Sequence, residues 1–254
     1  MDLGIKGRKA IILGGSRGMG RYTAGLMREE GASVAICARG AEGVGKAVAE
    51  LKATGSGGTV FGAPCNLEDG EATRDFCRKA LDALGGVDML IHNASGFDLT
   101  GGEDGWMRSF QVDMMAGVRA VEECEAALTE SEAASITFIG SMASKYYFGR
   151  SSSYGPAKGA MRVYANELAQ KYGKKKIRAN AISPGAVWFP GGSWDKRKKE
   201  MPDFYASVEK SIPLGRLGTA EELARVIAFV ASPAGGWINA AHIVVDGGQV
   251  AAVD

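Results

Sequence analysis

The chain has few of the side chains that bind metals or form disulfide bonds. Its 254 residues include only two histidines and four cysteines, and neither histidine has ligand spacing to a cysteine. The sequence therefore predicts no metal site. The cysteines, at positions 37, 65, 77 and 124, show no paired spacing. We expect free, buried thiols, the usual state in the cytoplasm.

An excess of charge and a long apolar run are also lacking. The 30 Lys and Arg side chains face 29 Asp and Glu side chains, which gives a net charge of +1 and no sign of a nucleic-acid partner. No apolar run is long enough to cross a membrane, and the first residues lack the apolar stretch of a signal peptide. We therefore predict a cytoplasmic protein that binds neither nucleic acid nor membrane.

Glycine, by contrast, is plentiful, and several of the 37 glycines form a turn near the amino terminus. Residues 9–13 read as a short buried strand, residues 14–20 are glycine-rich, and a helical stretch follows to about residue 30. Strand, glycine turn and helix form the first half of a dinucleotide-binding unit, where the helix N-terminus offers amide donors to a pyrophosphate. No Gly-Lys-Ser/Thr closes the loop, which excludes a P-loop.

A tyrosine and a lysine four residues apart are the second signal. Tyr154 and Lys158 would lie on one face of a helix, and Ser141 precedes Tyr154 by 13 residues. Because an ammonium beside a phenol favours the phenolate, we expect the pKa of Tyr154 to fall from about 10 towards the working pH. The pattern alone fits a solvated surface pair equally well. The glycine turn and Ser141 favour a proton-transfer site.

Strand-like and helix-like segments alternate along the whole chain. Strands are predicted near 9–13, 33–38, 59–64, 87–92, 134–140, 177–183 and 242–246, and helices near 18–30, 41–53, 69–84, 103–127, 152–173, 195–211 and 219–231. This alternation predicts an α/β fold with one doubly wound, seven-stranded parallel sheet and helices on both faces. No linker or repeat indicates a second domain. Ligands of such sheets bind at the carboxyl ends of the strands.

These motifs together resemble the short-chain dehydrogenase/reductase family. Gly14, Gly18 and Gly20 have its Gly-x-x-x-Gly-x-Gly spacing. Four further motifs match the family: residues 92–95 its Asn-Asn-Ala-Gly motif, Ser141 with Tyr154 and Lys158 its catalytic set, residues 183–185 its Pro-Gly motif, and residues 245–248 its carboxy-terminal signature. The resemblance covers essentially the whole chain and points to members similar to 3-oxoacyl-[acyl-carrier-protein] reductases. It implies a Rossmann-type fold and a homotetramer or dimer, with helices 103–127 and 152–173 at one interface.

The resemblance also implies a mechanism and a cofactor site. Tyr154 would give a proton to a carbonyl oxygen that receives a hydride at its carbon, Ser141 would hold that oxygen, and Lys158 would bind the nicotinamide ribose. The implied cofactor-binding residues are in the glycine loop, on the Tyr154/Lys158 helix and after four strands: Gly14, Ser16, Arg17, Gly18, Met19, Gly20, Arg39, Asn66, Leu67, Asn93, Ala94, Ser95, Tyr154, Lys158, Pro184, Gly185 and Val187.

The residues after the second predicted strand favour NADP(H) over NAD(H). NAD-binding Rossmann enzymes usually place an acid there to hold the ribose 2′-hydroxyl. This chain has Arg39 at that point and Arg17 in the glycine loop, and two guanidinium groups suit a 2′-phosphate. A solvent-facing role for Arg39 would leave the preference open. Asn66 stands where the family usually has an aspartate near the adenine.

Several positions depart from the family pattern. Leu13 replaces a threonine, His92 an asparagine, Ser95 a glycine, and Phe189 a threonine that commonly contacts the nicotinamide carboxamide. Asp113 aligns with the family's fourth catalytic residue, an asparagine that holds a water in the proton relay. An aspartate there can hold the same water and favour a protonated Lys158, or it can perturb the relay and slow turnover.

Aromatic residues after the later strands are candidates for a substrate pocket. The predicted substrate-binding residues are Phe97, Ser141, Met142, Tyr147, Trp188 and Trp194, with Tyr146 and Phe189 as further candidates. Residues 188–212 would form a lid hinged at Gly191 and Gly192. Ordinary core or interface packing is the competing interpretation for each aromatic residue. An aromatic lining suits an apolar or ring-bearing ketone.

The sequence therefore predicts an NADPH-dependent carbonyl reductase with Ser141, Tyr154, Lys158 and Asp113 at its catalytic centre. An NAD(P)-dependent dehydrogenase of a secondary alcohol, a cyclic alcohol or a steroid is the second hypothesis. A dinucleotide-sensing regulator without turnover is the third, and the complete Ser/Tyr/Lys set argues against it.

Overall fold

Seven parallel strands form the central sheet, in the order β3-β2-β1-β4-β5-β6-β9. The computed structural model describes residues 1–55, 57–97, 99, 101–147 and 151–251. The strands of this sheet are β1 (Lys9–Leu13), β2 (Ser33–Ala38), β3 (Val60–Pro64), β4 (Met89–His92), β5 (Ser135–Ile139), β6 (Arg178–Pro184) and β9 (His242–Val245). The predicted doubly wound Rossmann-type sheet is confirmed, and the strand order reverses between β1 and β4.

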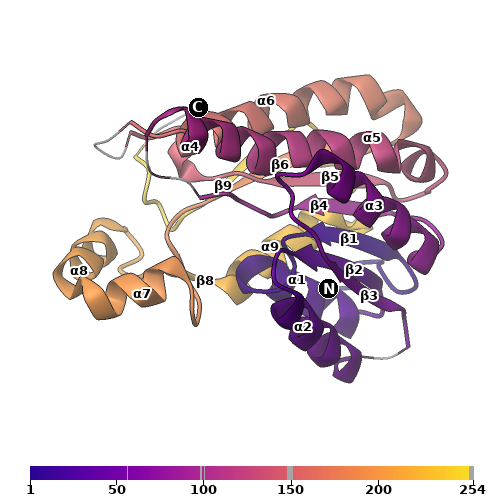
Figure 1. The fold of residues 1–254 in the computed structure, drawn as a ribbon, viewed down its shortest axis with the longest axis horizontal. Coiled ribbons are helices and arrows are strands. Elements are labelled where there is room, and N and C mark those ends of the chain that lie inside the picture. The colour runs from indigo at the N-terminus through magenta and orange to yellow at the C-terminus, as the bar shows by residue number, and fades with distance from the viewer. Residues whose placement is uncertain (56, 98, 100, 148–150, 252–254) are drawn as a thin grey trace.

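Helices cover both faces of the sheet (Figure 1). On one face lie α1 (Gly18–Glu29), α2 (Ala41–Ala53) and α9 (Ala220–Ala231), and on the other lie α3 (Gly70–Leu84), α5 (Ala116–Thr129) and α6 (Tyr154–Tyr172). The central strands are buried on both sides, which explains why β1 is a continuous apolar run rather than an alternating one. Two hydrophobic cores, one under each layer of helices, hold the sheet between them.

Two predicted helices are each divided in the structure. The helix predicted over 103–127 consists of α4 (Glu103–Ser109), a π-helix (Phe110–Met115) and α5. The helix predicted over 195–211 consists of α7 (Ser193–Glu200) and α8 (Pro202–Ser211). Pro202 is the first residue of α8, where its missing amide hydrogen costs nothing, but it cannot continue α7.

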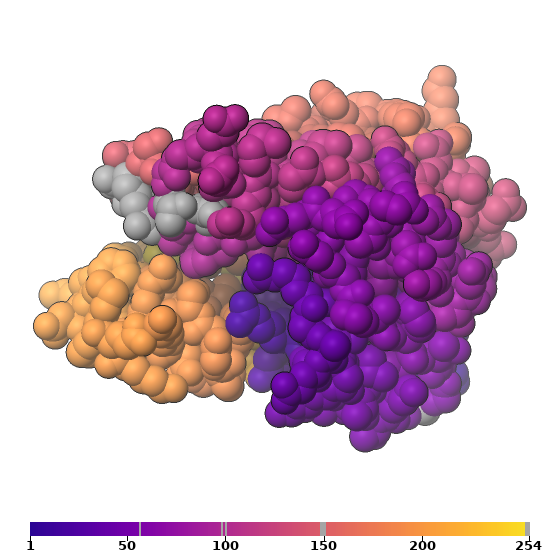
Figure 2. All heavy atoms as spheres, viewed as in Figure 1, coloured from indigo at the N-terminus to yellow at the C-terminus, as the bar shows by residue number. Residues whose placement is uncertain are grey.

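A second, two-stranded sheet is absent from the sequence-based prediction. It pairs β7 (Val187–Trp188) with β8 (Gly218–Thr219) in parallel. Helices α7 and α8 lie between these two strands in the chain and form a lobe beside the main body (orange in Figures 1 and 2). Thr219 then starts α9 with a capping box, in which its hydroxyl accepts from the Glu222 amide and the Glu222 carboxylate accepts from the Thr219 amide.

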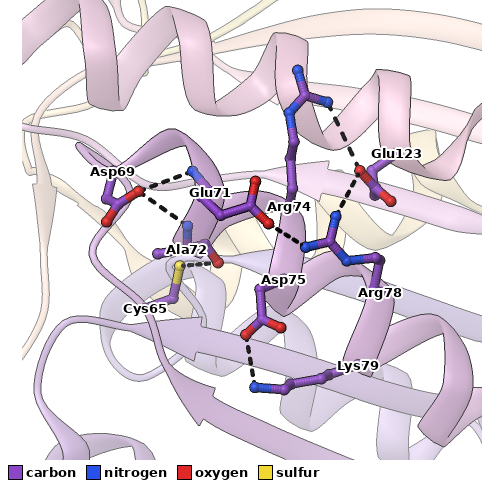
Figure 3. A network of polar contacts seen from close by, with 9 residues as sticks. All are labelled: Cys65, Asp69, Glu71, Ala72, Arg74, Asp75, Arg78, Lys79 and Glu123. Atoms are coloured by element: carbon purple, nitrogen blue, oxygen red, sulfur yellow. Dashed lines mark hydrogen bonds and ion pairs between the residues drawn. The ribbon is translucent and has the colours of Figure 1, made fainter.

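The turn after β3 is held in place by the first turn of α3 (Figure 3). Asp69 accepts hydrogen bonds from the amides of Glu71 and Ala72, and the Cys65 thiol contacts the Ala72 carbonyl at 3.4 Å. Arg78 joins α3 to Glu123 of α5. These contacts fix residues 65–67 near the carboxyl end of the sheet. All four cysteines are buried and free, as expected.

No helix within the described ranges is long and apolar enough to cross a membrane.

Candidate active site

Tyr154, Lys158 and Ser141 come together at the carboxyl end of the sheet. Tyr154 is the first residue of α6, and Lys158 lies one turn later with its ammonium 5.9 Å from the centre of the Tyr154 ring. Ser141 follows β5 and hydrogen-bonds the Tyr154 phenol. Its hydroxyl also accepts from the Ala143 amide at 3.1 Å, which caps a short 3₁₀ helix at Met142–Ser144.

Asp113 contacts Lys158 directly. Its Oδ1 atom lies 2.9 Å from Lys158 Nζ in an ion pair whose side chains are 0% and 2% exposed. Lys158 also donates to the Ile139 carbonyl at 2.9 Å, and Asp113 Oδ2 accepts from the Gly96 amide at 3.0 Å. The aspartate therefore places a full negative charge against the lysine, where the family's asparagine would offer a neutral amide.

The pKa of Tyr154 rises rather than falls. Burial is the largest influence and raises this pKa above 10.0, the Lys158 ammonium and the Ser141 hydrogen bond lower it by less, and Asp113 raises it further. The expectation of a lowered pKa was wrong because it counted the lysine without the burial of the phenol, which outweighs it. At neutral pH Tyr154 therefore carries its proton.

Three glycines of the loop between β1 and α1, Gly14, Gly18 and Gly20, have no room for a side chain. Gly14 and Gly18 have φ angles of +81° and +53°, which favour glycine. A Cβ on Gly20 would lie 2.3 Å from the Gly14 carbonyl oxygen. The first turn of α1 has no side-chain cap, so its amides remain available to an anion.

The segment after β4 is joined to this loop. Asn93 donates from its side-chain amide to the Gly14 carbonyl at 2.8 Å, and a Cβ on Gly14 would lie 2.8 Å from Ala94. Arg17 and Arg39 are exposed, at the start of α1 and the end of β2, and no acid lies between residues 37 and 40. The close backbone packing and uncapped amides fit the diphosphate of a dinucleotide.

A cavity of about 1240 Å³ opens beside Tyr154, and Figure 2 shows the hollow between the orange lobe and the body. Five predicted substrate-binding residues line it: Phe97, Ser141, Met142, Tyr147 and Trp194. Phe97 has a φ angle of +46°, and its ring meets that of Tyr154 edge-on at 5.2 Å. Tyr146 also lines the cavity.

Trp188 and Phe189 are not part of this lining. Trp188 packs near α8 with Tyr205 and Leu217, and sequence alone did not reveal the small β7–β8 sheet that turns it away. The Phe189 ring lies over the glycine loop, since a Cβ on Gly18 would come within 2.6 Å of it. Phe189 is therefore a neighbour of the first turn of α1.

Met201, Phe204 and Gln249 line the cavity too, and the sequence carried no signal for this role. Arg197, Met201 and Phe204 come from α7, α8 and the turn between them, and Gln249 follows the Asp-Gly-Gly motif. Arg197 lies over the rings of Trp194 and Phe97, at 4.7 and 6.0 Å. In the sequence, only the amphipathic spacing of residues in α7 and α8 could have indicated that one face of these helices turns towards the cavity.

The comparisons with known proteins agree with this geometry. A family model described as enoyl-(acyl carrier protein) reductase matches residues 14–249. The chain belongs to the short-chain dehydrogenase/reductase family. As a member of that family, this short-chain dehydrogenase/reductase is an NAD(P)-dependent oxidoreductase that acts on CH–OH or C=O groups.

Individual relatives of this short-chain dehydrogenase/reductase cover nearly the whole chain. Isoepoxydon dehydrogenase of Aspergillus clavatus is 35% identical over 96% of this chain and 95% of that protein. The 3-oxoacyl-[acyl-carrier-protein] reductase of Chlamydia pneumoniae is 31% identical over 98% and 99%. L-Sorbose reductase of Gluconobacter frateurii, solved with NADPH and L-sorbose, has a TM-score of 0.91 at 25% identity and full coverage of both chains.

Proposed function

We propose that this protein is an NADPH-dependent reductase of a ring-bearing or apolar ketone, with Tyr154 as the general acid. The observation that carries the proposal is the arrangement of Ser141, Tyr154 and Lys158 between the glycine loop and the large cavity. A bound nicotinamide would supply the hydride. The protein would supply orientation and the proton.

Each residue of the site has a defined task in this reaction. The substrate carbonyl oxygen lies against the hydroxyls of Ser141 and Tyr154, where Ser141 donates a hydrogen bond as negative charge develops. Tyr154 donates its proton to the same oxygen. Because the pKa of Tyr154 is raised, the protonated form that reduction requires prevails at neutral pH.

The cofactor would be held by the glycine loop and its neighbours. The free amides in the first turn of α1 would bind the diphosphate. Asn93 and Ala94 would hold the glycine loop in place through their contacts with Gly14. We propose NADP(H) over NAD(H), because Arg17 in the glycine loop and Arg39 directly after β2 are cations that suit a 2′-phosphate. The L-sorbose reductase solved with NADPH supports this preference.

Oxidation of a secondary or cyclic alcohol is the second candidate. Isoepoxydon dehydrogenase, at 35% identity, favours it by its name. The aromatic lining of the cavity suits a ring in either direction of the reaction. In both cases we propose that residues 188–212, with α7 and α8, act as the lid over the substrate.

A homotetramer or dimer stays a prediction. Helices α5 and α6 lie side by side on one outer face (Figure 1), and Trp106, Met107 and Phe110 beside them are 39%, 54% and 37% exposed. Light scattering on the purified protein measures the assembly directly. A monomer at micromolar concentration would contradict the prediction.

The test combines cofactor binding with turnover. Binding of NADPH and NADH is titrated by protein fluorescence, and a panel of linear and cyclic ketones is assayed with wild type and Tyr154→Phe. We expect tighter NADPH binding, reduction of at least one ketone, and loss of turnover without loss of cofactor binding in the variant. Cofactor binding without Tyr154-dependent turnover on any carbonyl would instead identify a dinucleotide sensor.

A further inference from the structure

His92 lies at the end of β4, completely enclosed between the sheet and the helices of one face. Its side chain is 1% exposed, and the Phe138 ring meets it edge-on at 6.1 Å. A Cβ on Gly117 would come within 2.9 Å of the imidazole, so α5 approaches the ring as closely as a glycine allows. The imidazole is therefore closely packed by β5 on one side and by α5 on another.

The neutral form of this imidazole follows from its surroundings. Burial and the nearby Lys158 ammonium lower the pKa of His92 to about 4. A neutral imidazole carries one N–H group. The Nε2 atom lies 2.9 Å from the Asp113 carbonyl oxygen, which can only accept, so Nε2 holds the hydrogen and donates it. Nδ1 has no partner within the described part of the chain.

The contact with His92 falls in the irregular part of the helix. Asp113 lies in the π-helix Phe110–Met115, a widened turn of the kind often found at functional sites. The last residue of β4 and the segment after it both bind Asp113, His92 at the backbone carbonyl and the Gly96 amide at the carboxylate. The remaining carboxylate oxygen points to Lys158.

We propose that His92 is a positioning residue, whose imidazole holds the backbone of the π-helix so that the Asp113 carboxylate contacts Lys158. The proposal rests on the proposed function, because Lys158 matters through its neighbour Tyr154. A buried histidine that only fills space and satisfies a carbonyl is the alternative. The two interpretations differ in one testable respect. If His92 positions Asp113, replacing His92 changes the pKa of Tyr154; if His92 only fills space, it does not.

The charged groups around Tyr154 determine what a displaced Asp113 would do. Lys158 of α6 lowers the pKa of Tyr154 and Asp113 of the π-helix raises it. Lys145 and Arg197 are further charged residues that line the cavity beside Tyr154. If Asp113 moves away, the Lys158 charge acts on Tyr154 without its counter-ion, and Tyr154 loses its proton at lower pH.

The experiment compares His92→Leu, His92→Asn, Asp113→Asn and the double variant His92→Leu/Asp113→Asn. Two pH midpoints are measured in each: the fall of kcat/KM for ketone reduction, and the tyrosinate absorbance that disappears in Tyr154→Phe. Cys124→Ala is the matched control, because Cys124 is equally buried on α5 and does not contact Asp113. Thermal unfolding is followed for all variants.

We expect His92→Leu to move both midpoints to lower pH, by at least half of the shift that Asp113→Asn causes. In the double variant, His92→Leu should cause no shift beyond that of Asp113→Asn alone. His92→Asn, which keeps an amide donor, shifts them by less than half as much as His92→Leu. Cys124→Ala lowers the unfolding temperature without moving either midpoint. Unchanged midpoints in His92→Leu, or an equal shift in the Asp113→Asn background, overturn the proposal.

Two further outcomes are informative. If Tyr154→Phe retains activity, the proposed function fails, while the absorbance midpoint of Tyr154 still tests His92. If His92→Leu does not fold, His92→Gln replaces it in both backgrounds. The same comparison then applies, because a shift in the wild-type chain that vanishes with Asp113→Asn supports positioning and a shift in both overturns it.

Discussion

Lys158 and Asp113 form a buried ion pair, with 2.9 Å between the ammonium nitrogen and a carboxylate oxygen. The pair lies one helical turn from Tyr154 and connects the proton-donating phenol to the π-helix. The attraction between such charges is offset by the cost of removing both from water. An asparagine at position 113 would leave the Lys158 ammonium buried without a counter-ion.

Asp113→Asn should shift the pH profile of ketone reduction to lower pH. Asp113 raises the pKa of Tyr154, so removing its charge lets Lys158 lower that pKa. Reduction needs the protonated phenol, and the rate therefore falls at a lower pH than in wild type, while alcohol oxidation rises at a lower pH. Steady-state kinetics in both directions across pH checks this. A shift to higher pH would contradict the assigned electrostatics.

The same variant should be less stable. Removal of one partner from a buried ion pair leaves an uncompensated charge and costs about 3 kcal/mol. We expect a loss of this order in the free energy of unfolding, measured by urea denaturation at neutral pH. Glu71→Gln is the control, because its ion pair with Arg78 on α3 is exposed and screened by solvent, so its loss should change the stability far less.

Arg39→Asp should reverse the cofactor preference. An acid at this position repels a 2′-phosphate and can accept a hydrogen bond from a 2′-hydroxyl. We expect NADPH affinity to fall by about tenfold or more, the equivalent of one lost charge-assisted hydrogen bond, and NADH affinity to rise. Lys79→Asp changes an exposed cation on α3 by the same charge and should leave both affinities unchanged. Fluorescence titration distinguishes the two variants.

Gly18→Ala should weaken cofactor binding, and Phe189→Ala should relieve part of the loss. The new Cβ would lie 2.6 Å from the Phe189 ring at a φ angle of +53°, so both a clash and backbone strain arise. The left-handed conformation alone costs about 1–2 kcal/mol. The double variant removes only the clash. NADPH titration and thermal unfolding measure the two contributions.

Gly43→Ala is the matched control for this substitution. Gly43 lies in α2 and has open space around its Cβ position. Alanine there should stabilise the protein by about 0.5–1 kcal/mol because it favours the helix. If Gly43→Ala weakened NADPH binding as much as Gly18→Ala does, the inference that the glycine loop binds the cofactor would be wrong.

Glu222→Gln should destabilise the protein only above acidic pH. Arg216 is the main cause that lowers the pKa of Glu222 to about 2 from 4.5, and the Thr219 amide adds to it. A carboxylate whose pKa is lowered by folding stabilises the fold at any pH above its pKa in the unfolded chain. This stabilisation is lost as the pH falls through its pKa in the folded protein. The difference between wild type and variant should therefore vanish between about pH 4.5 and 2. Urea denaturation across pH measures it.

The sequence was most informative where the local pattern of residues and the packing in the folded protein favour the same secondary structure. The strand positions predicted from the sequence match all seven strands of the main sheet, and β1 reads as a continuous apolar run because it is buried on both faces. It was least informative where chain segments meet. Nothing local distinguishes the π-helix at Phe110–Met115 from the α-helices around it, or places Trp188 in a second sheet.

The sequence alone determined the fold class, the glycine loop and the spacing of Ser141, Tyr154 and Lys158, since each depends on residues close together in the chain. Only the tertiary structure decided the electrostatics. Burial of the phenol, with a smaller contribution from Asp113, reverses the expected shift in the pKa of Tyr154. Asp113 reaches this site because its side chain meets Lys158 in the interior, although the two are 45 residues apart in the chain. A pKa depends on distance and burial in space, and neither can be derived from residue order.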